Sequence, residues 1–146
     1  MSAFVSNPEL KKRGEEVGRI LYGEGLGEEM HEAYRRKSPD IMDMSVEWVQ
    51  GGLIGRPGLD LKTRELILIP QCAVAGIGMG AVNDPVVAHA QGALRAGATK
   101  REIYEALLMS IWYLGAGPIH VALTALQDFF DEEFFATEFP ENSDPK

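Results

Sequence analysis

The most constraining feature of this chain is the stretch from His89 to Gly117, HAQGALRAGATKREIYEALLMSIWYLGAG, which predicts two helices separated by one sharply specified break. Gly97 stands where the end of a helix favours a left-handed residue. Thr99 and Glu102 then form a T-x-x-E capping box that starts a new helix. Small residues dominate the first helix and allow close approach of a neighbour. We therefore expect His89 to lie within a packed helical interior.

Start and stop signals along the rest of the chain predict an all-α fold of about seven helices. Pairs of a capping residue and proline, such as Asn7-Pro8 and Ser38-Pro39, mark several of the starts. No stretch shows the period-two pattern of a strand, and the polar tail 137–146 is expected to fray. The expected helices cover about 8–22, 28–37, 39–49, 61–76, 85–97, 100–114 and 118–135.

Length, charge and composition limit the kinds of protein that this chain can be and the kinds of partner that it can bind. A chain of 146 residues is expected to form a single domain, 1–146. The net charge of −8 argues against nucleic acid or an anionic membrane as partner. The sequence has no signal-peptide pattern and no apolar run of membrane-spanning length, so we expect a cytoplasmic protein. With Cys72 as the single cysteine and three scattered histidines, no metal site is expected.

Two titratable residues are candidates for acid–base chemistry. Glu65 begins a helix that is apolar nearly all round, so its carboxyl could be buried and poorly ionised. Pro70 in the same helix is expected to kink it. His89 shares a helical face with Val86 and Ala93. The structural alternatives are that Glu65 sits in an exposed first turn and that His89 is an ordinary core histidine.

Three further side chains are candidates for binding a substrate at this place. Cys72 lies two helical turns after Glu65 on the same face and could line the same cavity, or it could be a small buried hydrophobe. Arg56 and Arg64 flank the start of the Glu65 helix. Either could grip a carboxylate through a bidentate contact, and both could equally be surface arginines.

The last candidates are Trp112, Tyr113 and His120. The two aromatic residues could wall a pocket, although such residues usually belong to the core. His120 follows a helix start and could contact a substrate or only the helix N-terminus. His31 lies among charged residues and is expected to be exposed.

These motifs resemble the carboxymuconolactone decarboxylase family. The segments that carry the resemblance are GRPGLDLKTRELILI and HAQGALRAGATKREIYEALLMSIWYLGAG, and it extends over about residues 15–126. Glu65 and His89 match positions of the family motif. The resemblance implies an all-α fold like that of alkylhydroperoxidase D, assembled as homotrimers or homohexamers. It also implies active sites near subunit boundaries, no organic cofactor, and a role in the breakdown of aromatic compounds.

The sequence departs from the peroxidase branch of that family. That branch carries a C-x-x-C motif, and the matching positions here are Val82 and Pro85. A two-thiol mechanism is therefore unavailable. The segment from Ala75 to Asp84 is also longer than in typical members and could reshape the mouth of the pocket.

Three functions remain open. The first is a cofactor-free decarboxylase, or a related isomerase or hydratase, acting on a small carboxylated lactone or β-keto-like compound. In it His89 and Glu65 would supply acid–base and oxyanion chemistry. The second is a non-enzymatic binding protein whose C-terminal phenylalanines bury on a neighbouring subunit. The third is a peroxidase that uses Cys72 alone, which requires an accessible thiol.

Overall fold

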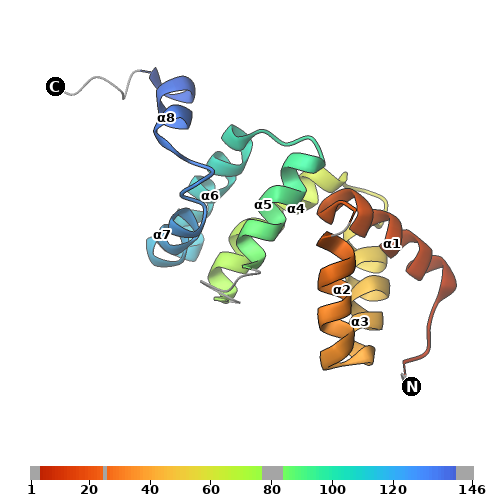
Figure 1. Cartoon of the computed structure of the whole chain (residues 1–146). Coiled ribbons are helices and arrows are strands. Elements are labelled where there is room, and N and C mark those ends of the chain that lie inside the picture. The colour runs from red at the N-terminus through yellow and green to blue at the C-terminus, as the bar shows by residue number, and fades with distance from the viewer. Residues whose placement is uncertain (1–3, 25, 77–83, 141–146) are drawn as a thin grey trace. The chain divides into compact units, whose positions relative to one another are not determined.

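The computed structural model describes residues 4–24, 26–76 and 84–140, and every regular element within them is helical. The predicted all-α class is confirmed, with more helices than the seven expected (Figure 1). The elements are α1 (Pro8–Tyr22), α2 (Leu26–Lys37), α3 (Pro39–Met44), the π-helix η1 (Ser45–Ile54), α4 (Leu61–Ala75), α5 (Pro85–Arg95), α6 (Lys100–Leu114), α7 (Ala116–Ala125) and α8 (Glu132–Glu138).

The chain forms two compact units, Met1–Arg64 and Glu65–Lys146. The first contains α1, α2, α3 and η1, and nearly all of α4 to α8 belongs to the second. The single domain expected over 1–146 stays a prediction.

Local capping explains where the helices of the first unit begin. The Asn7 side chain accepts hydrogen bonds from the backbone N–H groups of Glu9 and Leu10, and Ser38 caps α3 in the same manner. Both predicted starts are confirmed. The start of α4 is also as predicted, because Asp60 Oδ1 accepts from the Thr63 N–H at 2.7 Å.

The helix expected over about 39–49 does not end there, because Gly51 and Gly52 lie inside the π-helix η1. Gly51 and Gly14 are the points where η1 and α1 touch backbone to backbone. A Cβ at Gly14 would lie 1.9 Å from the Val46 carbonyl oxygen, and one at Gly51 would lie 2.1 Å from that of Leu10. These glycines therefore serve close helix packing rather than a chain break.

The second unit has one continuous apolar core, and the break predicted after α5 is confirmed within it. Gly97 has a φ of 95°, and Thr99 and Glu102 form both halves of the capping box. Asp84 caps α5 through the Val86 N–H at 2.9 Å. The fully buried side chains of this core are Ile69, Val86, Ala90, Ala93, Ile103, Leu107, Ile119, Ala122 and Leu126.

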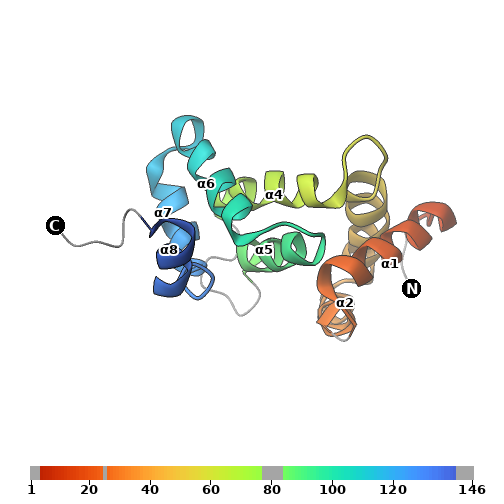
Figure 2. The same cartoon turned by 90° about the horizontal axis from the view of Figure 1, so that it is seen from above.

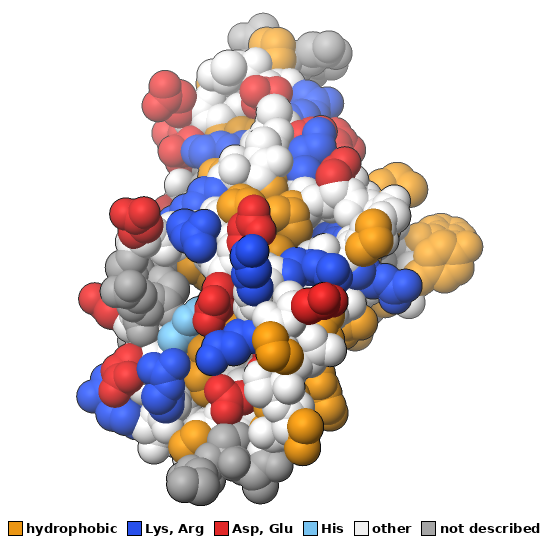
Figure 3. Space-filling view, turned by 90° about the vertical axis from the view of Figure 1, so that its right-hand side faces the viewer, with side chains coloured by type: hydrophobic (Ala, Val, Ile, Leu, Met, Phe, Trp, Pro, Cys, Tyr) orange, Lys and Arg blue, Asp and Glu red, His pale blue; other side chains and the backbone are white. Residues whose placement is uncertain are grey.

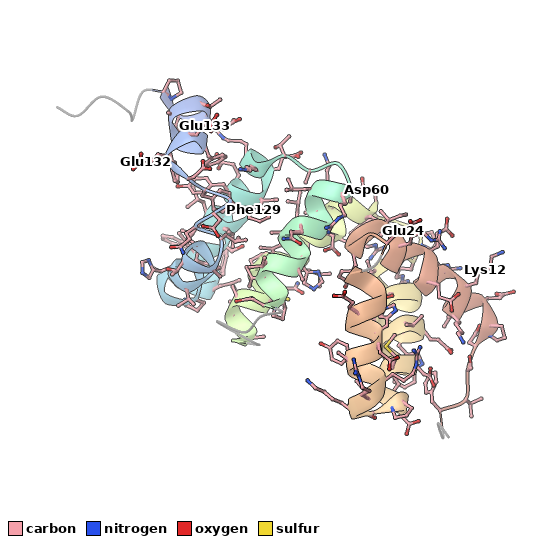
Figure 4. All side chains as sticks on the ribbon, viewed as in Figure 1. Lys12, Glu24, Asp60, Phe129, Glu132 and Glu133 are labelled. Carbon is pink, nitrogen blue, oxygen red and sulfur yellow. The ribbon has the colours of Figure 1, made fainter. Side chains whose placement is uncertain are left out.

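The single last helix expected over 118–135 is wrong, because the chain forms α7 and α8 instead. Asp131 caps α8 by accepting from the Phe134 N–H at 2.8 Å, which starts a new helix where the prediction had none. Figure 4 shows the connection between the two helices at Phe129, and Glu132 and Glu133 in the first turn of α8. Acidic residues in that turn favour the helix start.

The C-terminal phenylalanines pack within the chain itself. Phe130 and Phe134 are buried, and both contact the ring of Tyr104. Phe139 also packs on Tyr104, with the Arg101 guanidinium 3.9 Å from the Phe139 ring centre. These rings form an intrachain cluster, and their expected burial on a neighbouring subunit stays a prediction. The expected frayed tail is ordered as far as this ring, and residues 141–146 lie outside the described part of the chain.

Basic and acidic side chains alternate over the face drawn in Figure 3, without a large patch of one sign. Figure 2 gives the view of the helices from above. Among the helices that the structure describes, none combines the length and apolar character needed to cross a membrane.

Candidate active site

Glu65 and His89 form a buried pair inside the second unit. Glu65 Oε2 lies 2.8 Å from His89 Nδ1, which joins α4 to α5. The Glu65 side chain is 0% exposed and that of His89 is 16% exposed. The burial predicted for Glu65 is therefore confirmed, and its exposed first-turn alternative is wrong, while His89 is mostly buried.

His89 is held in its protonated form by this arrangement. Burial by itself lowers the pKa of the imidazole, because it penalises the charged form. Hydrogen bonds to Cys72 and Glu65, together with the electrostatic effects of these two groups, outweigh burial and raise the pKa of His89 from 6.5 to about 9. At neutral pH the ring is an imidazolium, which is a proton donor with both nitrogens protonated.

Cys72 belongs to the same cluster, as its spacing from Glu65 predicted. It lies on α4 and packs against the core of the second unit while remaining partly exposed. Its side chain hydrogen-bonds with His89. Since Nδ1 of His89 faces Glu65, the other ring nitrogen is available to the thiol or to a substrate. The structure thus brings Glu65, His89 and Cys72 together from residues up to 24 positions apart.

One atom of the cluster is left without a partner. Glu65 Oε1 is buried and makes no hydrogen bond within the structure. A buried carboxylate oxygen in this state is costly, so the cluster leaves one acceptor unsatisfied. No set of three or more His, Cys, Asp or Glu side chains that could hold a metal occurs in residues 4–24, 26–76 and 84–140.

The two candidate arginines lie in the first unit. The Arg64 guanidinium donates to three backbone carbonyls of the preceding turn, those of Arg56 and Pro57 through Nη2 at 2.8 and 3.4 Å and that of Leu59 through Nε at 3.2 Å. Arg64 therefore stabilises the turn that leads into α4. Arg56 is exposed. Their contact with a carboxylate substrate stays a prediction.

The remaining candidates lie on the surface of α6 and α7. Trp112 and Tyr113 are 86% and 88% exposed, so neither belongs to the core. His120 is also exposed, and its backbone carbonyl accepts from the Thr124 hydroxyl at 3.0 Å. Within the described residues, none of the three hydrogen-bonds with Glu65 or His89. Their role in binding substrate stays a prediction.

The sequence analysis missed a second set of buried polar groups, in the first unit. Glu47 is 1% exposed and accepts hydrogen bonds from the Ser6 hydroxyl and the Asn7 N–H. Gln50 is 2% exposed, and its Oε1 has no partner, like the buried Nε2 of His31. The expectation of an exposed His31 is wrong. Polar residues within the apolar run VEWVQ were the available signal.

Comparison with known proteins shows which family and which individual proteins this chain is similar to. The model of the carboxymuconolactone decarboxylase family matches residues 39–128, more than half of the chain. A nitrosuccinic acid decarboxylase of Metarhizium robertsii is 31% identical over 97% of this chain and 100% of its own length. An uncharacterised 15.0 kDa protein of Paracoccus denitrificans is 37% identical over 62% of this chain and 65% of its own.

Glu65 and His89 both lie within the matched range, in motifs that the sequence analysis compared with that family. The matched range and the near-complete alignment with a decarboxylase support a decarboxylase-type function. The chain belongs to the carboxymuconolactone decarboxylase family.

Proposed function

We propose that this protein is a cofactor-free carboxy-lyase in which His89 donates the proton that replaces the departing carboxylate. The observation that carries the proposal is the buried pair of Glu65 and His89, with 2.8 Å between Oε2 and Nδ1 and the imidazole protonated at neutral pH. A protonated imidazole in a largely dry site supplies both positive charge and a proton.

The reaction divides into two events. Loss of CO₂ breaks a carbon–carbon bond and leaves its electron pair on the substrate. An adjoining electron-withdrawing group must absorb that pair, as an enolate when the group is a carbonyl and as a nitronate when it is a nitro group. His89 then protonates the carbon. Because the substrate carries its own electron sink, the mechanism needs no organic cofactor.

Glu65 acts on His89 rather than on the substrate. Its carboxylate accepts the hydrogen bond from Nδ1–H, which fixes the orientation of the ring and directs the opposite N–H toward the reacting carbon. The negative charge of Glu65 also keeps the imidazole protonated between turnovers. Cys72, whose side chain hydrogen-bonds with the same ring, would line the substrate site.

The substrate class follows from the comparisons and from the electron sink. The family is named for a carboxylated lactone, and one relative for the decarboxylation of nitrosuccinic acid. Both compounds are small and carry a carboxylate near an electron-withdrawing group. We therefore propose a small carboxylic acid of this type, such as 4-carboxymuconolactone or a nitro dicarboxylic acid. A homotrimer or homohexamer remains part of the proposal.

The test is CO₂ release from a panel of carboxylated lactones, β-keto acids and α-nitro acids, using wild type, His89→Gln and the surface variant Glu105→Gln. We expect release by wild type and Glu105→Gln, and a rate at least about 100-fold lower for folded His89→Gln. Equal release by folded His89→Gln and wild type would remove His89 from the chemistry. No release from any compound by wild type would overturn the carboxy-lyase assignment.

A further inference from the structure

Cys72 is placed for chemistry of its own. It is partly exposed, it hydrogen-bonds with the imidazole of His89, and that imidazole is held by a fully buried carboxylate. The order of groups is therefore carboxylate, imidazole and thiol. The same order occurs around activated nucleophiles, where a charged imidazole lies beside the sulfur and a third group orients the ring.

A second observation points to a ligand at the same cluster. Glu65 Oε1 is buried, and it has no hydrogen-bond partner although the Glu65 side chain is 0% exposed. Glu65 and Cys72 share one face of α4 and contact the same imidazole. A bound molecule at the thiol that carries an N–H or O–H group could satisfy this oxygen. The cluster is thus incomplete in a way that a ligand would complete.

We propose that Cys72 is a covalent attachment site for electron-poor alkenes, which are alkenes conjugated to a carbonyl or nitro group. In this reaction His89 supplies the proton that the adduct takes up. In the addition, a bond forms between Sγ and the β-carbon while the π bond of the alkene breaks. The electron pair of that bond moves to the α-carbon as an enolate or nitronate. The protonated ring of His89 gives a proton to the α-carbon, and the proton that leaves the thiol restores the imidazolium, so no oxidant or further reactant is required.

The choice of electrophile rests in part on the proposed function. Addition to such an alkene creates the same kind of stabilised carbanion that decarboxylation creates, and His89 protonates both. A peroxide is the less suitable partner, because it would leave an oxidised sulfur that a second thiol must reduce. The sequence contains one cysteine.

Attachment at Cys72 has a direct consequence for the pair beside it. A group bound to Sγ fills the space next to His89, where the substrate of the proposed reaction must enter. The adduct is therefore expected to inhibit decarboxylation, which would make Cys72 a point at which reactive alkenes switch the enzyme off.

The test measures N-ethylmaleimide addition to the native full chain at pH 7 by intact mass, with no carboxylated substrate present. Cys72→Ser defines the site, and Glu105→Gln is the matched surface control for Glu65→Gln. We expect one adduct on wild type and on Glu105→Gln, none on Cys72→Ser, and rates at least about tenfold lower for His89→Gln and Glu65→Gln. Circular dichroism verifies that each variant is folded. If only one of His89→Gln and Glu65→Gln folds, the labelling rate of that variant is enough to test the inference.

Two results would overturn the inference. One is a native wild type that stays unlabelled while the urea-unfolded chain is labelled, because the thiol would then be unreachable. The other is equal labelling of wild type and the folded His89 or Glu65 variants, because the thiol would then be reachable but not activated. Either result can occur in a protein that releases CO₂, and fast labelling can occur in one that does not, so this inference and the proposed function fail separately.

Discussion

Glu65 and His89, 24 positions apart in the sequence, are joined across α4 and α5 by a contact of 2.8 Å between Oε2 and Nδ1. The carboxylate is entirely removed from solvent and the ring almost so. Two opposite charges in such a place depend on each other, because either one alone would be an uncompensated buried charge. The raised pKa of His89 therefore depends on Glu65 and on the thiol of Cys72.

Replacing Glu65 by Gln is expected to lower the pKa of His89 by about one unit or more, because it removes an adjacent negative charge. The measurement is a pH titration of the imidazole signals by NMR, in which three histidines give separate resonances. Glu105→Gln removes a carboxylate from an exposed pair with Arg101 and should leave the titration of His89 unchanged. An unchanged pKa of His89 in folded Glu65→Gln would mean that the pair does not hold the proton.

The stabilising effect of His89 is expected to disappear at alkaline pH. Its pKa is raised from 6.5 to about 9 on folding, so the folded protein binds the proton more tightly than the unfolded chain. The resulting stabilisation is complete below 6.5 and is lost as the pH rises through about 9. We expect the difference in free energy of unfolding between wild type and His89→Gln, from urea titrations, to shrink across this window. A difference that stays constant from pH 6 to 10 would contradict the raised pKa.

His31 is expected to act in the opposite direction. Burial and the charge of Arg35 lower its pKa, against a smaller opposing effect of Glu15. The unfolded chain therefore binds the proton more tightly, and the contribution of His31 to stability is present above 6.5 and is lost as the pH falls below it. Wild type should lose stability relative to His31→Gln on acidification from pH 7 to 5. A gain in relative stability over that range would show that the ring is not buried in its neutral form.

Gly14→Ala is expected to destabilise the first unit by about 3 kcal/mol or more, because its Cβ would lie 1.9 Å from the Val46 carbonyl oxygen of η1. Gly117→Ala is the matched control. Nothing lies within 4 Å of a Cβ at Gly117, and alanine favours a helix by up to about 1 kcal/mol over glycine. The measurement is the melting temperature of Gly14→Ala and of Gly117→Ala, each compared with wild type. Equal melting temperatures would mean that α1 and η1 are not in backbone contact.

Much of the fold could be predicted because its signals are local. The caps at Asn7, Ser38, Asp60 and Thr99 act on backbone groups two or three residues away, and each begins a helix as predicted. The continuation of the chain through Gly51 and Gly52 as a π-helix could not be predicted in this way, and neither could the close approach of Gly51 to Leu10 in another helix.

In the candidate site too, local features could be predicted from the sequence and contacts between helices could not. Helical spacing placed Cys72 on the face of Glu65, and the apolar surroundings of Glu65 indicated burial. The contact between Glu65 and His89 joins two helices, so neither spacing nor composition could establish it. The exposure of Trp112 and Tyr113 could not be predicted either. The sequence of an apolar helix does not show which of its faces packs against the rest of the protein.

The central claim is that the protonated form of His89 is the proton donor, and the pH dependence of kcat/KM for CO₂ release tests it most directly. We expect activity in wild type to fall as the pH rises through about 9, where His89 loses its proton. In Glu65→Gln the same fall should move to lower pH, in step with the pKa measured by NMR. Activity that instead rises through this range, or a fall that stays in place in Glu65→Gln, would contradict the claim.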